Sequence, residues 1–270
     1  MMPFYIIAGI LLFLFVLYLI LIAPTKNKRI EEYKTTLFAH RGLHNGERAE
    51  NSMSAFSAAV EGGYGIELDV RLSSDGELVV FHDDTLDRVC GVSGRVDGYT
   101  ADELSKMSLS GTDDGVPLFV DVLKLVAGKV PLLVEIKEDA GKYAVSDKTA
   151  EILASYDGPY IVESFNPLSL GNIAKKLPDI PRGILSQNYC KYEKYRKPLY
   201  FLLRCLLLNR VCKPSFIAYD HKDYKCVSLR IARALFGAAT FAWTVRSKEE
   251  EAAAREHGFD SVIFESYIPD

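Results

Sequence analysis

The stretch Phe38–Phe56, FAHRGLHNGERAENSMSAF, gathers many ionisable side chains directly after an apolar run. Crowding unpaired charge is costly, so such a sequence favours a working site over an ordinary loop. His40 could transfer protons near neutral pH, because an imidazole titrates there. Arg41 beside it is a cationic donor suited to a phosphate. The stretch therefore indicates a functional site.

Carboxylates occupy matching positions in two further apolar segments. Glu67 and Asp69 share a parity in GIELDVRL, as do Glu135 and Lys137 in PLLVEIK. In a parallel barrel, residues of one parity point inward, and charges at the carboxyl ends of strands are typical of active sites. Three converging carboxylates would repel one another unless a cation neutralised them. Oxygen ligands suit a hard ion, so we expect one divalent cation, Ca²⁺ or Mg²⁺, at Glu67, Asp69 and Glu135.

A hairpin is expected to bring a second imidazole to these carboxylates. Residues 74–76, Ser-Asp-Gly, join two strand-like runs, and a short polar turn that ends in Gly is a hairpin signal. Counting outward from the turn, His82 falls opposite the segment 67–69. His40 and His82 are therefore candidates for an acid–base pair, in an order that the spacing leaves open. Lys137 adds a second cationic donor for a phosphate.

The elements that must position these groups alternate along the chain. Short apolar segments separated by amphipathic stretches favour βα units and a parallel sheet. The expected strands are Thr35–Ala39, Gly65–Leu72, Pro131–Lys137, Tyr160–Phe165, Arg182–Ser186, Phe216–Asp220, Thr240–Val245 and Ser261–Phe264. The expected helices include Ser52–Val60, Ala144–Tyr156, Leu168–Lys176 and Ser247–His257. This order predicts an α/β fold, a closed (β/α)₈ TIM barrel. An open doubly wound sheet is the alternative, but no glycine-rich nucleotide fingerprint follows the first strand.

The N-terminus predicts a membrane anchor. Pro3–Ala23 carries no charge and is long enough to cross the hydrocarbon core of a bilayer. A cleaved signal peptide is the competing interpretation, but the run lacks a basic start and a good cleavage site. Lys26, Lys28, Arg29 and Lys34 follow the run, so the positive-inside rule places the rest of the chain in the cytoplasm. The five cysteines, odd in number and without a CxxC pair, agree with a reducing compartment.

Three regions follow from these observations. We expect a transmembrane anchor over 1–24, a linker over 25–34 and a catalytic barrel domain over 35–270, with insertions near 84–115 and 189–214. The second insertion combines leucines at helical spacing with many Lys and Arg, Arg196 among them. It is either a core helix of the barrel or an interfacial element that lies against anionic headgroups beside the anchor. The formal net charge of −4 gives no reason to expect a nucleic acid partner.

Taken together, these motifs resemble the glycerophosphodiester phosphodiesterase family of metal-dependent barrel enzymes. The matching stretches are AHRG (39–42), AENSMSAF (49–56), GIELDVRLSSDGELVVFHDDTLDR (65–88), VEIK (134–137), ESFN (163–166) and AWTV (242–245). The resemblance implies hydrolysis of glycerophosphodiesters to sn-glycerol 3-phosphate and an alcohol, with lysophospholipids as a further candidate substrate. It implies His40 and His82 as the acid–base pair, Glu67, Asp69 and Glu135 as metal ligands, Arg41 and Lys137 as phosphate contacts, and Glu50 and Asn51 at the site rim.

Departures from the family pattern bear on the substrate. Ala49 stands where the family usually has Pro, Arg246 replaces the usual Asn after WTV, and FESYIP replaces a closing Thr-Asp-x-Pro. Both late changes lie where the alcohol would sit, so they leave its identity open. Trp243 is either barrel packing or a substrate contact, and His44 is expected to be solvated in a surface loop.

Two alternative functions remain from the sequence. A relative of the phosphoinositide-cleaving phospholipases C would share the barrel and the paired histidines, but it fits the segment 67–83 less well. A catalytically silent, membrane-tethered binding protein would keep the barrel and lose site residues. None of the principal polar residues is missing, which favours an enzyme.

Overall fold

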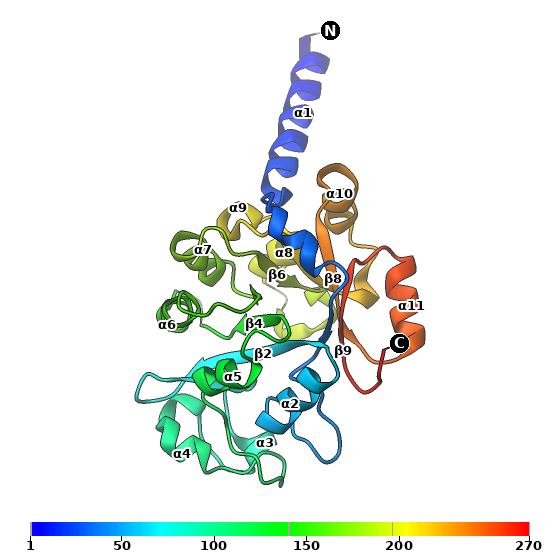
Figure 1. The fold of residues 1–270 in the computed structure, drawn as a ribbon. Coiled ribbons are helices and arrows are strands. Elements are labelled where there is room, and N and C mark those ends of the chain that lie inside the picture. The colour runs from blue at the N-terminus through cyan, green and yellow to red at the C-terminus, as the bar shows by residue number, and fades with distance from the viewer. Residues whose placement is uncertain (1, 140, 196, 270) are drawn as a thin grey trace.

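A closed parallel barrel forms the body of the protein in the computed structural model, which describes residues 2–139, 141–195 and 197–269 (Figure 1). Arg196 therefore lies outside the described residues. The sheet has nine strands: β1 (Leu37–Ala39), β2 (Gly65–Leu72), β3 (Leu78–Val80), β4 (Leu132–Ile136), β5 (Tyr160–Ser164), β6 (Arg182–Ser186), β7 (Phe216–Asp220), β8 (Ala239–Val245) and β9 (Ser261–Phe264). β1 pairs with both β2 and β9, which closes the ring, and only β3 runs antiparallel. The predicted TIM barrel is confirmed, and the open sheet is wrong.

Strand parity divides the barrel into an inner and an outer core. The inward residues include Phe38, Leu133, Ile161 and Phe241, and they form one buried cluster. Leu132, Val134 and Ile136 face the helices in a second cluster, as their parity predicts. Ile30 and Tyr33 of the short 3-10 helix η1 (Lys28–Tyr33) join the inner cluster. The segment expected as a linker therefore packs against the barrel interior.

The parallel register sets the acidic side chains side by side. Asp69 of β2 is aligned with Glu135 of β4, and Glu135 is aligned with Glu163 of β5. Glu67 is aligned with Leu133, one inward position earlier. Since strands of one parallel sheet end at the same edge, the carboxyl groups gather at the carboxyl end of the barrel.

Helices surround the barrel and connect its strands. They are α2 (Met53–Glu61), α5 (Phe119–Val126), α6 (Ala144–Leu153), α7 (Pro167–Lys176), α10 (Val227–Phe236) and α11 (Lys248–Glu256). Several begin at polar caps: the Ser52 side chain accepts from Ala55 N, and the Ser247 side chain accepts from Glu250 N. Such caps satisfy backbone donors of the first turn and fix where each helix starts. The four predicted helices are confirmed, with α6 ending earlier than expected.

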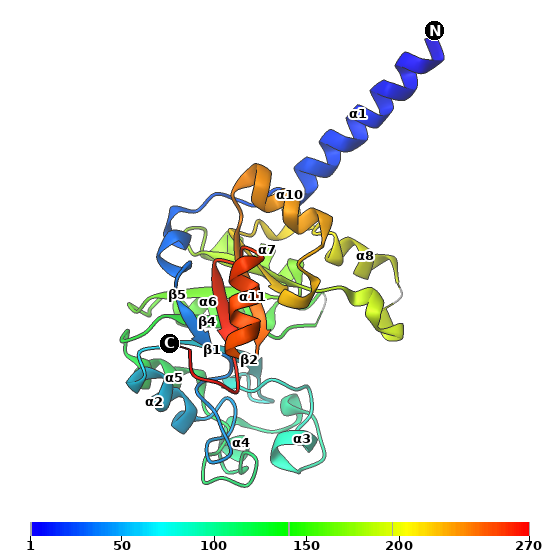
Figure 2. The ribbon, with the colours of Figure 1, turned by 90° about the vertical axis from the view of Figure 1, so that its right-hand side faces the viewer.

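An apolar helix extends away from the barrel. α1 (Met2–Ile22) contains a stretch, Phe4–Ile22, with a mean hydropathy of 3.0, long and apolar enough to cross a membrane (Figures 1 and 2). Its C-terminal end is attached to the barrel. Asn209 Nδ2 donates to Ile22 O at 2.7 Å, and the hydroxyls of Tyr18 and Ser228 lie 2.8 Å apart.

Both insertions form structure of their own. The first contains α3 (Asp87–Cys90) and α4 (Ala101–Ser105), which pack over a separate apolar cluster. The second contains the 3-10 turns η3 (Tyr189–Lys191) and η4 (Glu193–Tyr195) and the short helices α8 (Pro198–Arg204) and α9 (Asn209–Cys212). A single long core helix over this second segment is wrong, because the chain turns at Leu206, where φ is +57°.

Candidate active site

Three buried carboxylates form the centre of the site. Oxygen atoms of Glu67, Asp69 and Glu135 lie within 4.8 Å of one another. Lys137 Nζ lies 3.1 Å from Asp69 Oδ1 and 2.7 Å from Glu135 Oε1. Both oxygens are buried, and among the described residues they meet this one ammonium group as ion pairs without a further donor of good hydrogen-bond geometry. An oxygen-only set with unsatisfied acceptors fits a hard divalent cation.

The electrostatics of this cluster point the same way. Burial, together with the Asp69 and Glu135 charges, raises the pKa of Glu67 well above its usual value. Burial raises the pKa of Glu135 to about 7. Burial would also raise the pKa of Asp69, but the Lys137 cation and other nearby cations outweigh it and hold that pKa far below its usual range. Like charges that cannot all ionise together would be relieved by a bound dication.

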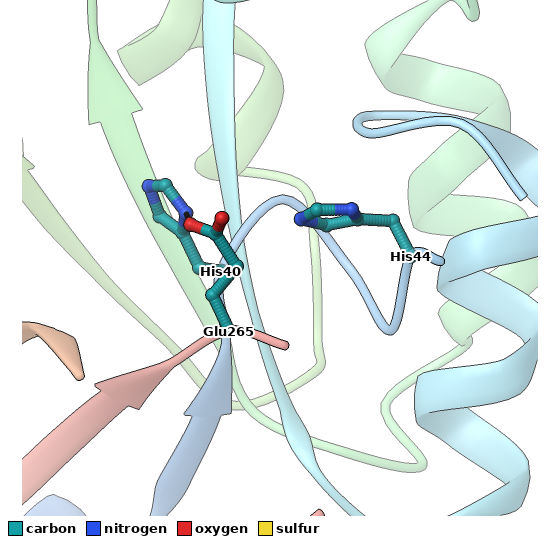
Figure 3. A group of neighbouring side chains, drawn as sticks. All are labelled: His40, His44 and Glu265. Atoms are coloured by element: carbon teal, nitrogen blue, oxygen red, sulfur yellow. Dashed lines mark hydrogen bonds and ion pairs between the residues drawn. The ribbon is translucent and has the colours of Figure 1, made fainter. Parts of the chain in front are cut away.

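His40 stands at the end of β1 with a carboxylate partner. Its Nδ1 lies 2.8 Å from Oε2 of Glu265, which follows β9 (Figure 3). This hydrogen bond holds the pKa of Glu265 at about 2, and burial lowers the pKa of His40. When Nδ1 donates to the carboxylate, the neutral ring keeps its lone pair on Nε2. His40 is therefore arranged to exchange a proton through Nε2.

A second imidazole faces the same carboxylate. Figure 3 shows the carboxylate of Glu265 between the rings of His40 and His44. His44 is half-buried, and burial lowers its pKa. The expectation of a solvated His44 is wrong, because its loop packs back against α2: Leu43 N donates to Ala55 O at 2.9 Å.

The turn after β1 brings Arg41 to the carboxylates. Arg41 and Gly42 have φ values of +56° and +79°, and the Arg41 backbone N–H donates to Glu67 Oε2 at 2.9 Å. A Cβ at Gly42 would lie 2.9 Å from a ring carbon of Phe56, so the turn requires glycine. The Arg41 side chain reaches Asp69, with Nε 3.5 Å from Oδ2.

The rim residues expected from the sequence hold these groups in place. Asn51 is buried and donates from Nδ2 to Asp69 Oδ2 at 2.8 Å. Glu50 accepts from Arg41 Nη1 at 2.8 Å and from Arg88 Nη2 at 2.7 Å. Asn51 thus supports a carboxylate inside the site, whereas Glu50 joins two arginines at its edge.

His82 follows the predicted hairpin and has its own carboxylate. Phe81 N donates to Asp69 O at 2.9 Å, which sets the next residue beside the acidic cluster. His82 Nδ1 lies 2.6 Å from Asp83 Oδ1, and Arg88 Nε lies 2.6 Å from Asp83 Oδ2. Burial lowers the pKa of His82 to about 4. A chain of ion pairs, Arg41–Glu50–Arg88–Asp83, which ends in the hydrogen bond from His82 to Asp83, therefore connects the two sides of the site.

A cavity of about 930 Å³ opens at this end of the barrel. Both predicted catalytic histidines line it, together with Glu67, Glu135 and Lys137. Trp243 also lines it, with its ring edge-on to Phe165 at a centroid distance of 5.4 Å. Trp243 therefore packs against Phe165 and also faces the cavity.

The sequence did not assign three supporting residues. Glu265 holds His40, and Arg88 holds Asp83. Glu163 is buried beside Glu135, and its pKa is raised well above its usual value by burial and by neighbouring carboxylates. The inward parity of Glu163 in ESFN was a usable signal. No sequence signal could have found the contact between Glu265 and His40, since it depends on closure of the barrel.

Comparisons with known proteins show the family and the fold of this chain. The model of the glycerophosphoryl diester phosphodiesterase family matches residues 40–267. A glycerophosphodiester phosphodiesterase of Caldanaerobacter subterraneus is 31% identical over 251 residues, covering 85% of this chain and 93% of that protein. A phosphodiesterase structure from Oleispira antarctica, in complex with the product sn-glycerol 3-phosphate, aligns with a TM-score of 0.73 at 21% identity, covering 87% of this chain and 95% of that one. A glycerophosphodiester phosphodiesterase structure from Thermotoga maritima aligns with a TM-score of 0.65 at 26% identity, covering 86% and 95%.

Proposed function

Since this chain belongs to the glycerophosphoryl diester phosphodiesterase family, we propose that the cavity between His40 and His82 is where it hydrolyses glycerophosphodiesters. The activity itself, that of a glycerophosphodiester phosphodiesterase, follows from family membership. One observation carries the assignment of the site: two histidines, each backed by a carboxylate on Nδ1, border the same cavity as a buried carboxylate cluster.

The two histidines divide the proton transfers. One accepts a proton at Nε2 from the nucleophile, which is either water or the 2-hydroxyl of the glycerol, and the other protonates the leaving alcohol. Overall, water is consumed, the bond between phosphorus and the alcohol oxygen breaks, and sn-glycerol 3-phosphate and the alcohol are released. Arg41 and Lys137 are the cationic side chains that would contact the phosphate oxygens.

Glu67, Asp69 and Glu135 are the residues that would hold the metal that this family requires. When bound, a divalent cation supplies positive charge that stabilises the phosphate oxygens in the transition state. Three carboxylate ligands fit Ca²⁺ and Mg²⁺ alike, and the two ions differ mainly in the number and rigidity of their ligands. Asn51 and the Arg41 backbone N–H orient Asp69 and Glu67.

We further propose that the chain is a single-pass protein of the cell membrane with its catalytic domain in the cytoplasm. Basic residues follow α1, and the positive-inside rule then applies. The attachment of α1 supports a retained helix over a cleaved signal sequence. Asn209 is buried and donates to Ile22 O, and Ile22 belongs to the barrel's outer core. Cleavage would leave that buried amide unpaired, at a cost of about 1–3 kcal/mol.

The proposed function is tested by incubating the full chain with glycerophosphocholine and measuring choline and glycerol 3-phosphate. Both products should form with Mg²⁺ or Ca²⁺ and stop forming with a chelator. Release of inositol phosphate from phosphatidylinositol instead would support the phospholipase C alternative. No turnover of either substrate would support the silent binding protein.

A further inference from the structure

A second cavity, of about 820 Å³, lies between α10, the end of α11 and the residue that follows η1. It shares no lining residue with the catalytic cavity. Among the described residues that line it, the only acidic one is Asp260, whose Oδ2 accepts from Thr240 N at 2.7 Å. The basic side chains that line it are Lys34, Lys225, Arg230, Arg233 and His257. Positive charge is therefore in excess here, and we call this the basic cavity.

Three of these cations have no acidic partner. Lys34 Nζ pairs with Glu31 Oε1 at 2.8 Å, whereas the other two arginines and lysine form no ion pair with any residue that the structure describes. Lys225 and Arg230 are exposed, and Arg233 is half-buried. Unpaired ammonium and guanidinium groups around one cavity are suited to the oxygens of a phosphate.

Packing holds several of these groups in place. Arg233 Nη1 donates to His257 O at 2.6 Å, and a Cβ at Gly258 would clash with Arg233 Nη2, so glycine leaves room for the guanidinium. The His257 ring stacks on the Tyr224 ring at a centroid distance of 3.5 Å, and Lys225 Nζ lies 5.4 Å from the centre of the Tyr224 ring. A ligand would therefore meet groups that are already positioned, which lowers the entropy cost of binding.

The helix α10 places the basic cavity near the base of the apolar helix. The hydroxyls of Ser228 on α10 and Tyr18 on α1 lie 2.8 Å apart. Both ribbon views show α10 beside the base of α1 (Figures 1 and 2). At a rise of 1.5 Å per residue, Arg230 and Arg233 lie only about 3 and 8 Å farther along α10 than Ser228. A bilayer that held α1 would therefore have its surface close to these cations.

Exposed apolar side chains accompany the cations on α10. Val227 and Leu235 are 64% and 62% exposed, about two helical turns apart. A short helix that presents both apolar and basic side chains beside a membrane span is typical of a surface that meets lipid headgroups. Free phosphate in solution would make no use of the apolar residues, whereas a phospholipid would contact both kinds of side chain.

We propose that the basic cavity binds the phosphate of an anionic phospholipid, at a site separate from the catalytic reaction. The lipid's hydrocarbon chains stay in the bilayer, so the inference rests on the proposed membrane anchor but not on the proposed reaction. A headgroup with a net negative charge is preferred over phosphatidylcholine, because the choline cation would face Lys225 and Arg230. The cytoplasmic leaflet, where the proposed topology places the barrel, is the one that carries anionic lipid.

Native mass spectrometry tests the site, because it identifies each bound lipid by its mass. The full chain is purified in detergent, and equal amounts of phosphatidylglycerol and phosphatidylcholine with matched hydrocarbon chains are added. A chelator is present, so that neither turnover nor a bridging metal ion contributes. We expect the wild-type chain to retain one phosphatidylglycerol at least about tenfold more often than one phosphatidylcholine.

The variants remove charge from the basic cavity. Arg230→Gln should lower the ratio of bound phosphatidylglycerol to phosphatidylcholine about fivefold, and the double substitution Lys225→Gln and Arg230→Gln should bring it to about one. Both residues are exposed, so the fold should tolerate the changes, which circular dichroism checks. The matched control is Lys129→Gln with Lys175→Gln. These two lysines are also exposed, form no ion pair among the described residues and line neither cavity.

The control variant should keep the wild-type ratio within twofold, which would support a specific site over a general effect of net charge. An equal fall in the control, or a double variant that keeps the wild-type ratio, would overturn the inference. An equal amount of inorganic phosphate should leave the lipid bound, because free phosphate lacks the contacts with Val227 and Leu235. Displacement of the lipid by that phosphate would overturn the assignment to a phospholipid. No turnover is measured, so failure of the proposed hydrolysis would not alter any of these results.

Discussion

Glu265 lies 225 positions after His40 in the chain, yet its Oε2 is 2.8 Å from Nδ1 of His40. The contact exists because β9 pairs with β1, so the last and the first strands end side by side. A carboxylate on Nδ1 fixes the tautomer and the orientation of the imidazole. Glu265 is therefore a positioning residue for the proposed acid–base pair.

Replacing Glu265 with Gln should lower kcat by a factor of about 10–10² and change KM little. The carboxylate raises the pKa of His40 against the effect of burial, so its loss lowers that pKa. The limb of the pH–rate profile that His40 controls should then move to lower pH. Glu249→Gln, an exposed change on α11, is the control. An unshifted pH profile would rule out the positioning role.

His40→Ala and His82→Ala should each reduce kcat by a factor on the order of 10²–10⁴, the usual range for a general acid or base. The double variant should be little slower than either single one, because residues that act as a unit are non-additive. Circular dichroism checks that each variant is folded. Full turnover in either single variant would refute the pair.

Arg88→Met should lower kcat about tenfold, because Arg88 joins Glu50 to the carboxylate that orients His82. Arg95 offers a matched control. The two guanidinium side chains are 50% and 52% exposed, and each pairs with a nearby aspartate, but Arg95 pairs only with Asp97 among the described ion pairs. Arg95→Met should leave kcat within twofold of wild type. Equal effects of the two changes would show that the loss is not specific to the site.

Adding Mg²⁺ or Ca²⁺ should raise the Tm of the protein, and a chelator should reverse the rise. At a metal concentration 100 times Kd, the gain is about 2.7 kcal/mol, or roughly 5–10 °C. Glu67→Gln should lose most of this rise, whereas Glu163→Gln, equally buried but outside the three-carboxylate cluster, should keep it. Differential scanning fluorimetry decides the matter. A metal-dependent rise that survives Glu67→Gln would contradict the ligand assignment.

The orientation of the chain can be read from Cys190, the exposed cysteine of the described residues. A membrane-impermeant maleimide should label Cys190 only after cells are permeabilised, because the barrel is expected in the cytoplasm. Cys190→Ser should abolish the labelling. A single cysteine added before residue 1 in that variant should be labelled from outside. Labelling of Cys190 in intact cells would reverse the topology.

The local patterns predicted the barrel and the residues of its inner edge. Strand boundaries and the parity of Glu67, Asp69 and Glu135 needed only the two-residue period of a strand and the placement of a parallel sheet's ends. The partners of the histidines needed more. Glu265 meets His40 only when the barrel closes, and Arg88 reaches Glu50 from an inserted lobe. Neither contact can be predicted from the spacing of residues that are near one another in the sequence.

The second insertion shows a different limit. Leucines at 199, 202, 203, 206 and 207 fit one continuous helical face. In the structure, α8 ends at Arg204 and Leu206 adopts a left-handed backbone conformation, which ends that face. Within α8, Leu203 is buried while Leu199 stays exposed at the cavity. Apolar periodicity indicates which residues are favoured at buried positions, but it does not indicate where the chain turns.

The attachment of α1 through Asn209 and Ser228 has a kinetic consequence. A helix hydrogen-bonded to its catalytic domain cannot swing as a flexible tether would. An α1 seated in a bilayer would hold the catalytic cavity at one height and one tilt above the lipid. Encounters with any substrate that itself lay in the membrane would then depend on amounts per unit of membrane area, and diluting the surrounding solution would leave them unchanged. Weakening this attachment, for example with Asn209→Ala, would let the catalytic domain change its height and tilt above the membrane, and productive encounters with such a substrate would become slower.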